Sequence, residues 1–341
     1  MNATVKQPVA DASHVAQARR VSASVAAAAG LNDEAVARLA LIVSEGATNL
    51  LKHGSGGYIL FDTFRAASHH GEGTPAGVQA LFVDKGRGIA DTASAMRDGF
   101  STSGTMGGGL GAMHRAATLF DLYSLPGKGT VVLCTLAPSG SSTSPASGGR
   151  SGGLCVPYNG ETVSGDAWRV AVEGHRSAAI MVDGLGHGPM AARAAGEAVA
   201  AWQKDPFRPV AGIIALLDGA LRSTRGGAAA VAQINPARNV VSFAGVGNIV
   251  AMILGGAKNE HCVSMNGTLG QFGRPARTFD YPWSRGCCFI MHSDGLASRW
   301  NESDYPGLFA RSPALIAAVL HRDLERGRDD ASVVVIKETP A

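Results

Sequence analysis

The chain has 341 residues, of which 45% are hydrophobic and 17% charged, and its formal net charge is +3. That length favours two globular domains with a core each, and the chain has enough apolar residues to build both. Neither half of the sequence has the basic excess of nucleic-acid or anionic-membrane binders, so we expect protein or small-molecule partners, with no nucleic acid and no membrane.

A segment rich in Gly, Ser and Pro divides the sequence. Residues 138–153 read PSGSSTSPASGGRSGG and contain no apolar side chain larger than alanine. This composition is typical of a flexible linker. We therefore expect a first domain over residues 1–137 and a second over residues 154–341.

Helical and strand patterns alternate along the first domain. An amphipathic helix is predicted over Asp33–Lys52, where apolar residues recur at helical spacing. Strands are predicted at Tyr58–Phe64 and Val78–Val83, a second helix over Ala112–Phe120, and a closing strand at Thr130–Thr135. This order is typical of an α/β sandwich.

The second domain is predicted to contain mostly strands, with helices between them. The predicted elements are two strands (Ala167–Glu173, Ala178–Val182), two helices (Met190–Gln203, Val210–Leu221), four strands (Ala228–Ile234, Val240–Ala244, Val250–Leu254, Cys287–His292), a helix (Ala314–Glu325) and a last strand (Ser332–Ile336). Two antiparallel sheets flanked by helices fit that order.

Polar residues and glycines in the first domain suggest a nucleotide site. Glu45, Asn49 and His53 lie on one stripe of the first predicted helix, although a solvated helix face has the same pattern. Asp84 follows an apolar strand, where a carboxylate can accept a hydrogen bond from an adenine amino group. Residues 107–111, GGGLG, lead into the second predicted helix, whose free backbone N–H groups suit a triphosphate. Each glycine cluster alone is equally consistent with an ordinary turn.

The ordered set of motifs is more specific than any of its members. EGATNLLKH, DKGRGI, GFSTSGTMGGGLG and GKGT together resemble the GHKL ATPases, and most of all the anti-sigma-factor serine kinases of the RsbW and RsbT type. The resemblance implies a GHKL α/β sandwich that binds ATP with Mg²⁺ and is able to form a homodimer. It assigns Glu45 as catalytic base, Asn49 as Mg²⁺ ligand, Asp84 with Gly86 and Gly88 to adenine, Gly107, Gly109, Leu110 and Gly111 to the phosphates, and Thr130 to support of the adenine site.

Acidic residues stand at four strand or loop ends of the second domain. They are Asp166 in SGDAW, Asp183 in MVDGLGHG, Asp294 in MHSDGL, and the pair Asp329-Asp330 in GRDDASVVVI. Any one of them alone is equally consistent with a turn. Converging carboxylates raise each other's pKa unless cations lie between them. The set therefore predicts a binuclear Mg²⁺ or Mn²⁺ site, in which two ions about 3.5–4 Å apart activate water and bind a phosphoryl group.

The motifs around these acids resemble the PPM (type 2C) protein phosphatases, in the branch that contains SpoIIE and RsbX. They cover about Asp166–Ile336. The resemblance implies an α-β-β-α sandwich with antiparallel sheets. It makes Asp166, Asp183, Asp294, Asp329 and the Gly184 carbonyl metal ligands and leaves the role of Asp330 open. It assigns His187 and Gly188 to the shape of a turn.

One position departs from the pattern of many eukaryotic members. They carry a phosphate-binding Arg shortly before the first metal Asp, and no Arg stands between Gly153 and Asp166 here. Arg225, in TRGG, could compensate, but a structural role for it is favoured. How the substrate phosphate is held is therefore left open by the sequence.

The five cysteines point to a reducing compartment. Their number is odd and they show no Cys-x-x-Cys spacing, which is typical of reduced thiols rather than of disulfides or a zinc site. The N-terminus lacks a signal-peptide core, and no apolar run reaches the roughly 18–20 residues of a membrane span. We expect a cytoplasmic protein.

Together the two motif sets predict a bifunctional regulator of a bacterial partner-switching (stress or sigma-factor) pathway. One half would phosphorylate a Ser or Thr of a small STAS-type (anti-anti-sigma-like) protein, and the other would dephosphorylate a phosphorylated STAS-domain protein. A sigma factor or an RsbT-like kinase is a further expected partner. Two alternatives stay open: the first domain is only a nucleotide-gated sensor or docking module, or it is a non-enzymatic anti-sigma binder.

Overall fold

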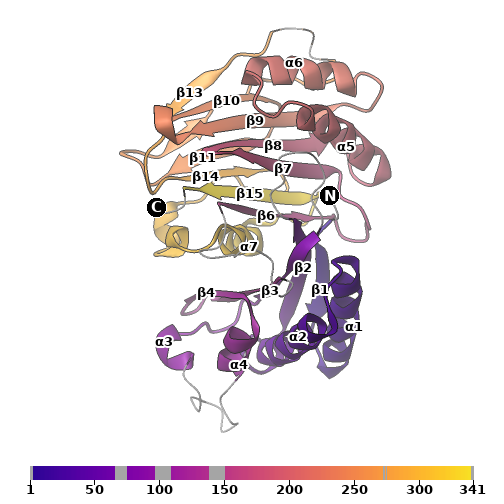
Figure 1. Cartoon of the computed structure of the whole chain (residues 1–341), viewed down its shortest axis with the longest axis vertical. Helices are drawn as coiled ribbons and strands as arrows, with labels where there is room; N and C mark the ends of the chain where they lie inside the picture. Colours follow the sequence, from indigo (N-terminus) through magenta and orange to yellow (C-terminus); the bar gives the residue numbers. More distant parts are fainter. Residues whose placement is uncertain are drawn as a thin grey trace.

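The computed structural model describes residues 3–65, 75–96, 109–137, 150–271, 273 and 275–338. Figure 1 shows two parts stacked along the long axis, with the N-terminal part below and the C-terminal part above. Both mix helices with antiparallel sheets, which confirms the predicted two-domain α/β class. Within the described residues, no helix is both long and apolar enough to cross a bilayer.

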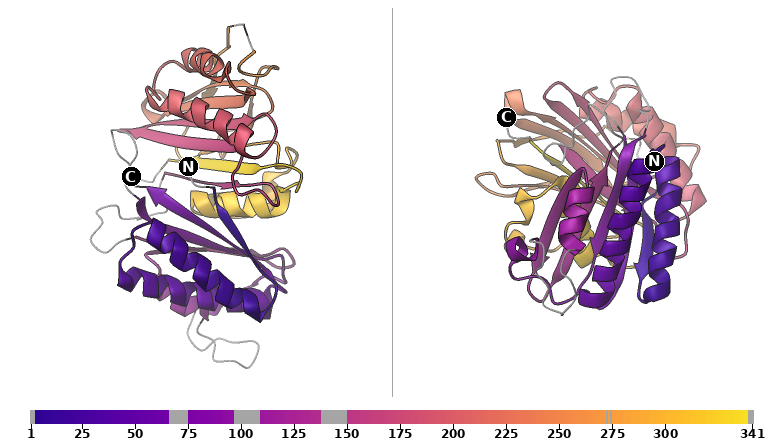
Figure 2. Two further views of the ribbon diagram at one scale, coloured as in Figure 1. Left: turned by 90° about the vertical axis from the view of Figure 1, so that its right-hand side faces the viewer. Right: turned by 60° about the horizontal axis from the view of Figure 1, so that its bottom comes forward.

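The N-terminal part is a five-stranded antiparallel sheet with helices on one face, as Figure 2 shows. The strand order is β1-β2-β3-β5-β4, formed by β1 (Val5–Val9), β2 (Gly57–Arg65), β3 (Pro75–Val83), β4 (Leu119–Leu125) and β5 (Gly129–Leu136). The helices are α1 (Ala12–Ala28), α2 (Asp33–His53), the short α3 (Thr92–Ala95) and α4 (Gly109–Ala116). Helices α1, α2 and α4 share a hydrophobic core with the sheet.

Helix α2 shows how the sequence produces this layer. The Asn32 side chain accepts a hydrogen bond from the Ala35 N–H at 3.0 Å, which satisfies a free donor at the start of the helix. Leu39 and Ile42 of the apolar stripe are buried against the sheet. A methyl group at Gly46 would collide with the Phe82 ring of β3, so this glycine allows close packing of helix and sheet.

The prediction of a helix over Ala112–Phe120 is wrong at its C-terminal end. Helix α4 ends at Ala116, and Phe120 lies in β4, which pairs with β5 along its whole length. In that strand Leu122 packs in the core under the helices, while its neighbour Tyr123 faces the other side of the sheet. Long-range strand pairing has overridden the local pattern there.

The C-terminal part contains two stacked five-stranded antiparallel sheets. One has the order β13-β10-β9-β8-β7, formed by β7 (Asp166–Glu173), β8 (Arg176–Gly184), β9 (Gly227–Asn235), β10 (Val240–Val246) and β13 (Phe279–Pro282). The other has the order β12-β11-β14-β15-β6, formed by β6 (Ser151–Val156), β11 (Val250–Leu254), β12 (Glu260–Cys262), β14 (Cys288–His292) and β15 (Ala331–Lys337). Strand β6 begins inside the segment predicted as a linker, of which residues 138–149 lie outside the described residues.

Helices cover the outer face of each sheet. Helices α5 (Pro189–Gln203) and α6 (Val210–Leu221) pack on the first sheet, and α7 (Pro313–Leu324) packs on the second. Strand β15 is buried on both faces, because Val333 and Val335 contact the α7 layer while Val334 and Ile336 fill the space between the sheets. The predicted α-β-β-α sandwich is confirmed.

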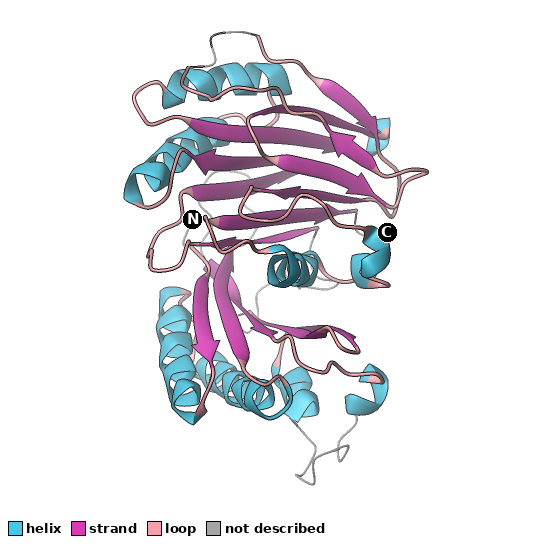
Figure 3. Cartoon of the chain, turned by 180° about the vertical axis from the view of Figure 1, so that it is seen from behind, coloured by secondary structure: helices cyan, strands magenta, loops and turns pink. Residues whose placement is uncertain are grey.

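Helix α7 also touches the N-terminal sheet. In Figure 3 it lies between that sheet and the second C-terminal sheet. One hydrophobic cluster joins residues of α7 such as Leu315 and Val319 to Leu81, Val131 and Leu133 of the N-terminal sheet. The face of this sheet opposite α1 and α2 is thus covered by the C-terminal domain, and the two domains share a core.

Candidate nucleotide site and candidate metal centre

Two predicted ATP-site residues meet the start of α4. A methyl group at Gly109 would lie 3.1 Å from the Glu45 Oε2 and 3.3 Å from the side-chain amide atoms of Asn49. The polar stripe of α2 therefore faces the N-terminal end of α4, where free N–H groups favour an anion. Gly111 is buried, and the Leu110 side chain packs against the core, so only the backbone of Leu110 would be available to a phosphate. Gly107 lies outside the described residues.

Asp84 is fixed at the end of β3 by backbone donors. Its Oδ1 accepts hydrogen bonds from the Gly86 N–H at 2.7 Å and the Thr130 N–H at 3.2 Å. The Thr130 hydroxyl in turn lies 2.8 Å from the Ser124 hydroxyl. Burial raises the pKa of Asp84. Within the described residues, the second carboxyl oxygen has no such partner, so it is the one available to an adenine amino group.

Glycines next to Asp84 permit close backbone approaches. A methyl group at Gly86 would lie 2.8 Å from the His53 carbonyl oxygen, and one at Gly88, whose φ is +70°, would collide with the Leu125 carbonyl. Larger residues at these two positions would push the loop away from α2 and β4. The predicted nucleotide-site residues thus form two groups, one at Glu45, Asn49 and Gly109 and the other at Asp84, Gly86 and Thr130.

Two predicted metal ligands stand opposite each other on neighbouring strands. Asp166, the first residue of β7, pairs in register with Asp183 near the end of β8. Asp166 is only 5% exposed, and its Oδ2 accepts a hydrogen bond from the Ser293 hydroxyl at 2.6 Å. A methyl group at Gly184 would collide with the Ala191 backbone, so this glycine lets α5 approach the strand end.

The other two predicted ligands come from the second sheet. Asp294 follows β14, and its Oδ2 accepts a hydrogen bond from the Asn248 side-chain amide at 2.7 Å. A side-chain hydrogen bond with Asn248 also lowers the pKa of Asp183, against the larger effect of burial. Asp329 precedes β15 and lines a cavity of about 420 Å³ together with Asp294. Asn248, which stands in GVGNI just before β11, is not among the site residues predicted from the sequence.

The pKa values of three of these carboxyl groups are raised by burial and by neighbouring acids. Burial, followed by the charges of Asp294 and Asp329, raises the pKa of Asp183 to about 7. Burial and the charge of Asp183 raise the pKa of Asp166 well above its ordinary value. The pKa of Asp329 is also raised, by burial first and then by Asp294. Only closely spaced carboxylates affect each other in this way.

The donor chemistry fits a hard divalent cation. Carboxylate oxygens and a backbone carbonyl are the ligands of Mg²⁺ and Mn²⁺, and a cation relieves the repulsion among the acids. Within the described residues, however, no group of three or more His, Cys, Asp or Glu side chains is arranged so that it could hold a metal ion. The acids converge as pairs, Asp166 with Asp183 across the strands and Asp294 with Asp329 at the cavity.

Asp330, whose role the sequence left open, is a structural anchor. Its two carboxyl oxygens accept hydrogen bonds from the Tyr158 and Gly165 N–H groups, both at 2.8 Å. These bonds hold the loop that leads to Asp166. His187 lies 2.9 Å from a carboxyl oxygen of Glu161, and its ring lies against that of Tyr158, which agrees with a role in the turn before α5.

Two arginines, which the sequence reasoning did not single out, line the cavity beside Asp294 and Asp329. They are Arg326 and Arg328, both exposed. Within the described residues, neither side chain makes a hydrogen bond or an ion pair. The signal that could have found them is their position in RGRDD, directly before the last acidic pair. Arg225 lies near the turn after β8, with Nη1 3.5 Å from the methyl position of Gly186.

Comparisons with known proteins agree with this architecture. Residues 9–136 match the family described as histidine kinase-like ATPase domain, and residues 173–338 match stage II sporulation protein E (SpoIIE). The serine/threonine-protein kinase RsbT of Bacillus subtilis (strain 168) is 32% identical over 118 residues, which are 35% of this chain and 84% of RsbT.

Solved structures are similar as well. A chain of the bacterial stressosome, a modular system adapted to control secondary messenger signaling, is 27% identical with a TM-score of 0.52, covering 55% of this chain and 98% of that one. RsbX in complex with magnesium is 20% identical with a TM-score of 0.47, covering 54% of this chain and 92% of that one.

The fold and the two family matches define a class of protein in which a GHKL-type, kinase-like ATPase domain precedes a PPM-type phosphatase domain. The predicted resemblance to both groups is confirmed. Through its first domain, which covers 84% of RsbT, the chain belongs to the RsbT family.

Proposed function

We propose that the C-terminal domain is a metal-dependent phosphoprotein phosphatase whose centre is formed by Asp166, Asp183, Asp294 and Asp329. The observation that carries the proposal is the position of Asp183, which pairs with Asp166 across two strands of the first sheet and lies close enough to Asp294 and Asp329 of the second for their charges, after burial, to raise its pKa to about 7. Such a centre is stable at neutral pH when cations balance its charge. Two Mn²⁺ or Mg²⁺ ions would supply Lewis-acid activation of water and of the phosphoryl group.

Other residues of the chain would position the acids and bind the phosphoryl group. The Ser293 hydroxyl and the Asn248 amide orient Asp166 and Asp294 by direct hydrogen bonds. Arg326 and Arg328 lie at the cavity and have no ion-pair partner in the part of the chain that the structure describes. They would bind the phosphoryl oxygens, since guanidinium groups match phosphate geometry. This pair would take the place of the Arg that is missing before Asp166.

The N-terminal domain would transfer phosphate from ATP to a Ser or Thr of a partner protein. In this proposal Asn49 holds Mg²⁺, Glu45 receives the hydroxyl proton, and Asp84 binds adenine. The contact of Glu45 and Asn49 with the start of α4 supports it. Similarity to RsbT and to a stressosome protein favours STAS-domain proteins of a partner-switching pathway as the shared substrate of both domains.

The test uses purified full-length protein and two assays. Mn²⁺-dependent hydrolysis of a phosphoserine peptide should fall on the order of 10³-fold in Asp183→Asn and Asp294→Asn, because loss of a metal ion removes several kcal/mol of transition-state stabilisation. Asp205→Asn, which changes a surface acid at the end of α5, is the matched control and should keep full activity. Full activity in both site variants would refute the assignment.

The kinase half is tested separately in the Asp294→Asn protein, in which dephosphorylation is blocked. Labelled ATP should then transfer phosphate to a STAS-domain protein, and the added Glu45→Gln change should abolish transfer without abolishing ATP binding. ATP binding without transfer in the Asp294→Asn protein would favour a nucleotide-sensing role for the first domain. The hydrophobic core that the two domains share at α7 is the observation that favours this second candidate function, nucleotide sensing.

A further inference from the structure

Helix α7 connects the two sites because it is buried on two sides. Of its twelve residues, all but Asp323 are buried. One side packs on β15 and β6 of its own domain, and the other packs on β3, β4 and β5 of the N-terminal domain. A helix held in this way moves as a unit with both neighbours, since close-packed interfaces do not deform continuously.

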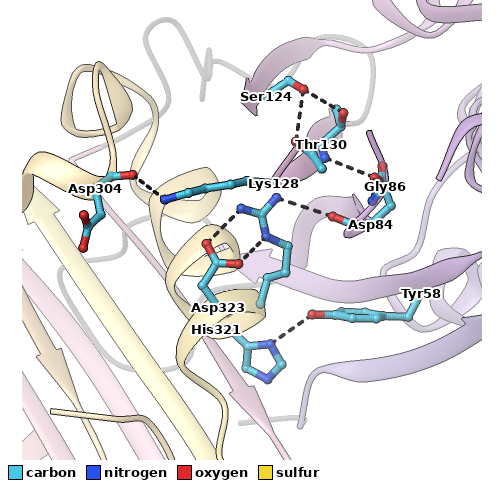
Figure 4. A network of polar contacts seen from close by, with 11 residues as sticks. Tyr58, Asp84, Gly86, Ser124, Lys128, Thr130, Asp304, His321 and Asp323 are labelled. Atoms are coloured by element: carbon cyan, nitrogen blue, oxygen red, sulfur yellow. Dashed lines mark hydrogen bonds and ion pairs between the residues drawn. The ribbon is translucent and has the colours of Figure 1, made fainter. Parts of the chain in front are cut away.

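The C-terminal end of α7 reaches the adenine-site residue Asp84. Arg322 is 2% exposed, and its Nη1 donates to the Asp84 backbone carbonyl at 3.4 Å. The other guanidinium nitrogens donate to the two carboxyl oxygens of Asp323, at 2.8 and 2.9 Å. Figure 4 shows this arrangement. A buried cation needs such partners, so displacement of the Asp84 loop would leave Arg322 poorly solvated.

Further polar contacts flank this one and fix the helix end. The Tyr58 hydroxyl lies 3.4 Å from the His321 Nδ1, and Lys6 forms a 3.1 Å ion pair with Glu325. Lys128 donates to the Asp304 carbonyl at 3.1 Å, which joins the hairpin after β4 to the C-terminal domain, as Figure 4 also shows. The interface is therefore polar around Asp84 and apolar along the helix.

The same helix end is bonded to the loop that carries a proposed metal ligand. The Arg326 N–H donates to the Gly295 carbonyl at 2.9 Å, and the Ala297 N–H donates to the Leu324 carbonyl at 2.8 Å. Gly295 directly follows Asp294. Three residues after Arg326, the chain reaches Asp329 at the same cavity. Backbone hydrogen bonds thus tie the loop of Asp294 to the segment that begins with Arg322, and the same segment continues to Asp329.

We propose that nucleotide bound at Asp84 tightens divalent-cation binding at the acidic centre, with Arg322 and residues 322–329 as the connecting element. The inference rests on the proposed function and adds a regulation to it. A base bound to Asp84 stabilises the position of the loop that contacts Arg322, and through this contact the end of α7 that leads to Asp294 and Asp329. Because the two ligands stabilise the same connecting element, each binds more tightly when the other is present.

The experiment measures Mn²⁺-dependent hydrolysis of para-nitrophenyl phosphate with and without saturating ADP, at free Mn²⁺ set by a metal buffer. In wild-type protein, ADP should lower the half-maximal Mn²⁺ concentration about 5-fold, a typical size for coupled sites. In Arg322→Met the shift should be less than about 2-fold, while hydrolysis without ADP and the binding of ADP persist. The effect of ADP on metal speciation is common to both proteins, so the difference between them reports the coupling.

A matched variant separates the Arg322 contact from the interface in general. Tyr58→Phe removes a contact of the same helix, that with His321, but keeps the one with Asp84. It should retain the full shift. If Arg322→Met does not fold, hydrogen exchange in the wild type tests the same claim, because ADP should slow exchange of the amides in residues 322–329.

Each outcome is decisive. Wild-type protein that binds ADP and hydrolyses the substrate with an unchanged Mn²⁺ dependence overturns the coupling and leaves the proposed phosphatase intact. An Arg322→Met protein that responds like the wild type, or unchanged exchange in residues 322–329, overturns the role of the helix end. Absence of hydrolysis, or of ADP binding, would refute the proposed function together with this inference.

Discussion

The nucleotide site and the acidic centre bury carboxyl groups in opposite ways. Asp84 accepts two backbone N–H groups and faces no other acid at hydrogen-bond distance among the described residues. Asp166 and Asp183 instead face each other across two strands, where burial and the charge of Asp183 raise the pKa of Asp166. We therefore expect the first site to need no counter-charge for its carboxyl group, and the second to gain stability at neutral pH when cations bind. The predictions below test that difference.

The largest expected effect comes from removing an uncharged side chain that donates a hydrogen bond to an acid of the centre. Asn248→Ala deletes the amide that donates to Asp294. Outer hydrogen bonds of this kind typically contribute 10–100-fold to metal affinity, so Mn²⁺ binding measured by calorimetry should weaken by about that factor. Asn259→Ala, which removes a surface amide bonded to Glu302, is the control and should bind Mn²⁺ normally. Equal affinities in both variants would mean that Asp294 is not a ligand.

A smaller effect is expected at the phosphate end of the same centre. Arg328→Met should raise KM for a phosphoserine peptide about 10-fold with a lesser change in kcat, because an exposed guanidinium contributes roughly 1.4 kcal/mol to binding an anion. Arg328→Lys should recover part of the loss. Arg225→Met is the informative counterpart: if it, rather than Arg328→Met, raised KM, the phosphate would be held from the turn after β8.

Packing at the nucleotide site is tested by a single methyl group. Gly109→Ala places it 3.1 Å from Glu45 and 3.3 Å from Asn49, and ADP affinity measured by fluorescence titration should fall by about 10-fold, or 1.4 kcal/mol. Gly196→Ala adds the same methyl group to α5, where nothing lies within 4 Å. That control should bind ADP as the wild type does. Unchanged binding in Gly109→Ala would show that Glu45 and Asn49 do not meet the nucleotide.

The smallest effect concerns Asp62, which lies outside both sites and accepts hydrogen bonds from the Thr63 N–H at 2.7 Å and the Thr4 hydroxyl at 3.3 Å. Burial raises the pKa of Asp62 in β2 to about 7. Because the pKa of Asp62 is higher in the folded protein than its ordinary value of 3.8, the contribution of this carboxyl group to stability is fully present below about pH 3.8. That contribution is lost as the pH rises toward 7. Asp62→Asn should therefore stabilise the protein at pH 8 by about 1–2 kcal/mol and leave it unchanged near pH 4. Urea unfolding at both pH values checks this, and equal effects at both would contradict it.

Local patterns predicted most elements because their information lies in neighbouring residues. The bounds of α6 and β11 agree with the predicted Val210–Leu221 and Val250–Leu254. Strand β1 and helix α1 were not predicted, and neither were the short edge strands β12 and β13. Edge strands pair on one side only, so few of their residues need to be apolar.

Candidate site residues could be named from the sequence where they stand in a motif, but not where the fold brings distant residues together. The acids and the nucleotide residues stand in motifs, so their numbers could be read from the sequence. Arg326 and Arg328 became candidates only when the cavity placed them beside Asp294. The contact of Arg322 with Asp84 joins residues that are 238 positions apart, which no local pattern contains. A helix as apolar all round as α7 was nevertheless a signal that it is buried on two sides.

The most direct test of the central claim is a calorimetric titration of nucleotide-free protein with Mn²⁺, in the wild type and in Asp183→Asn. The account predicts two ions per chain in the wild type, with at least one lost in the variant. The same stoichiometry and affinity in both proteins would contradict a cation centre built on these carboxylates.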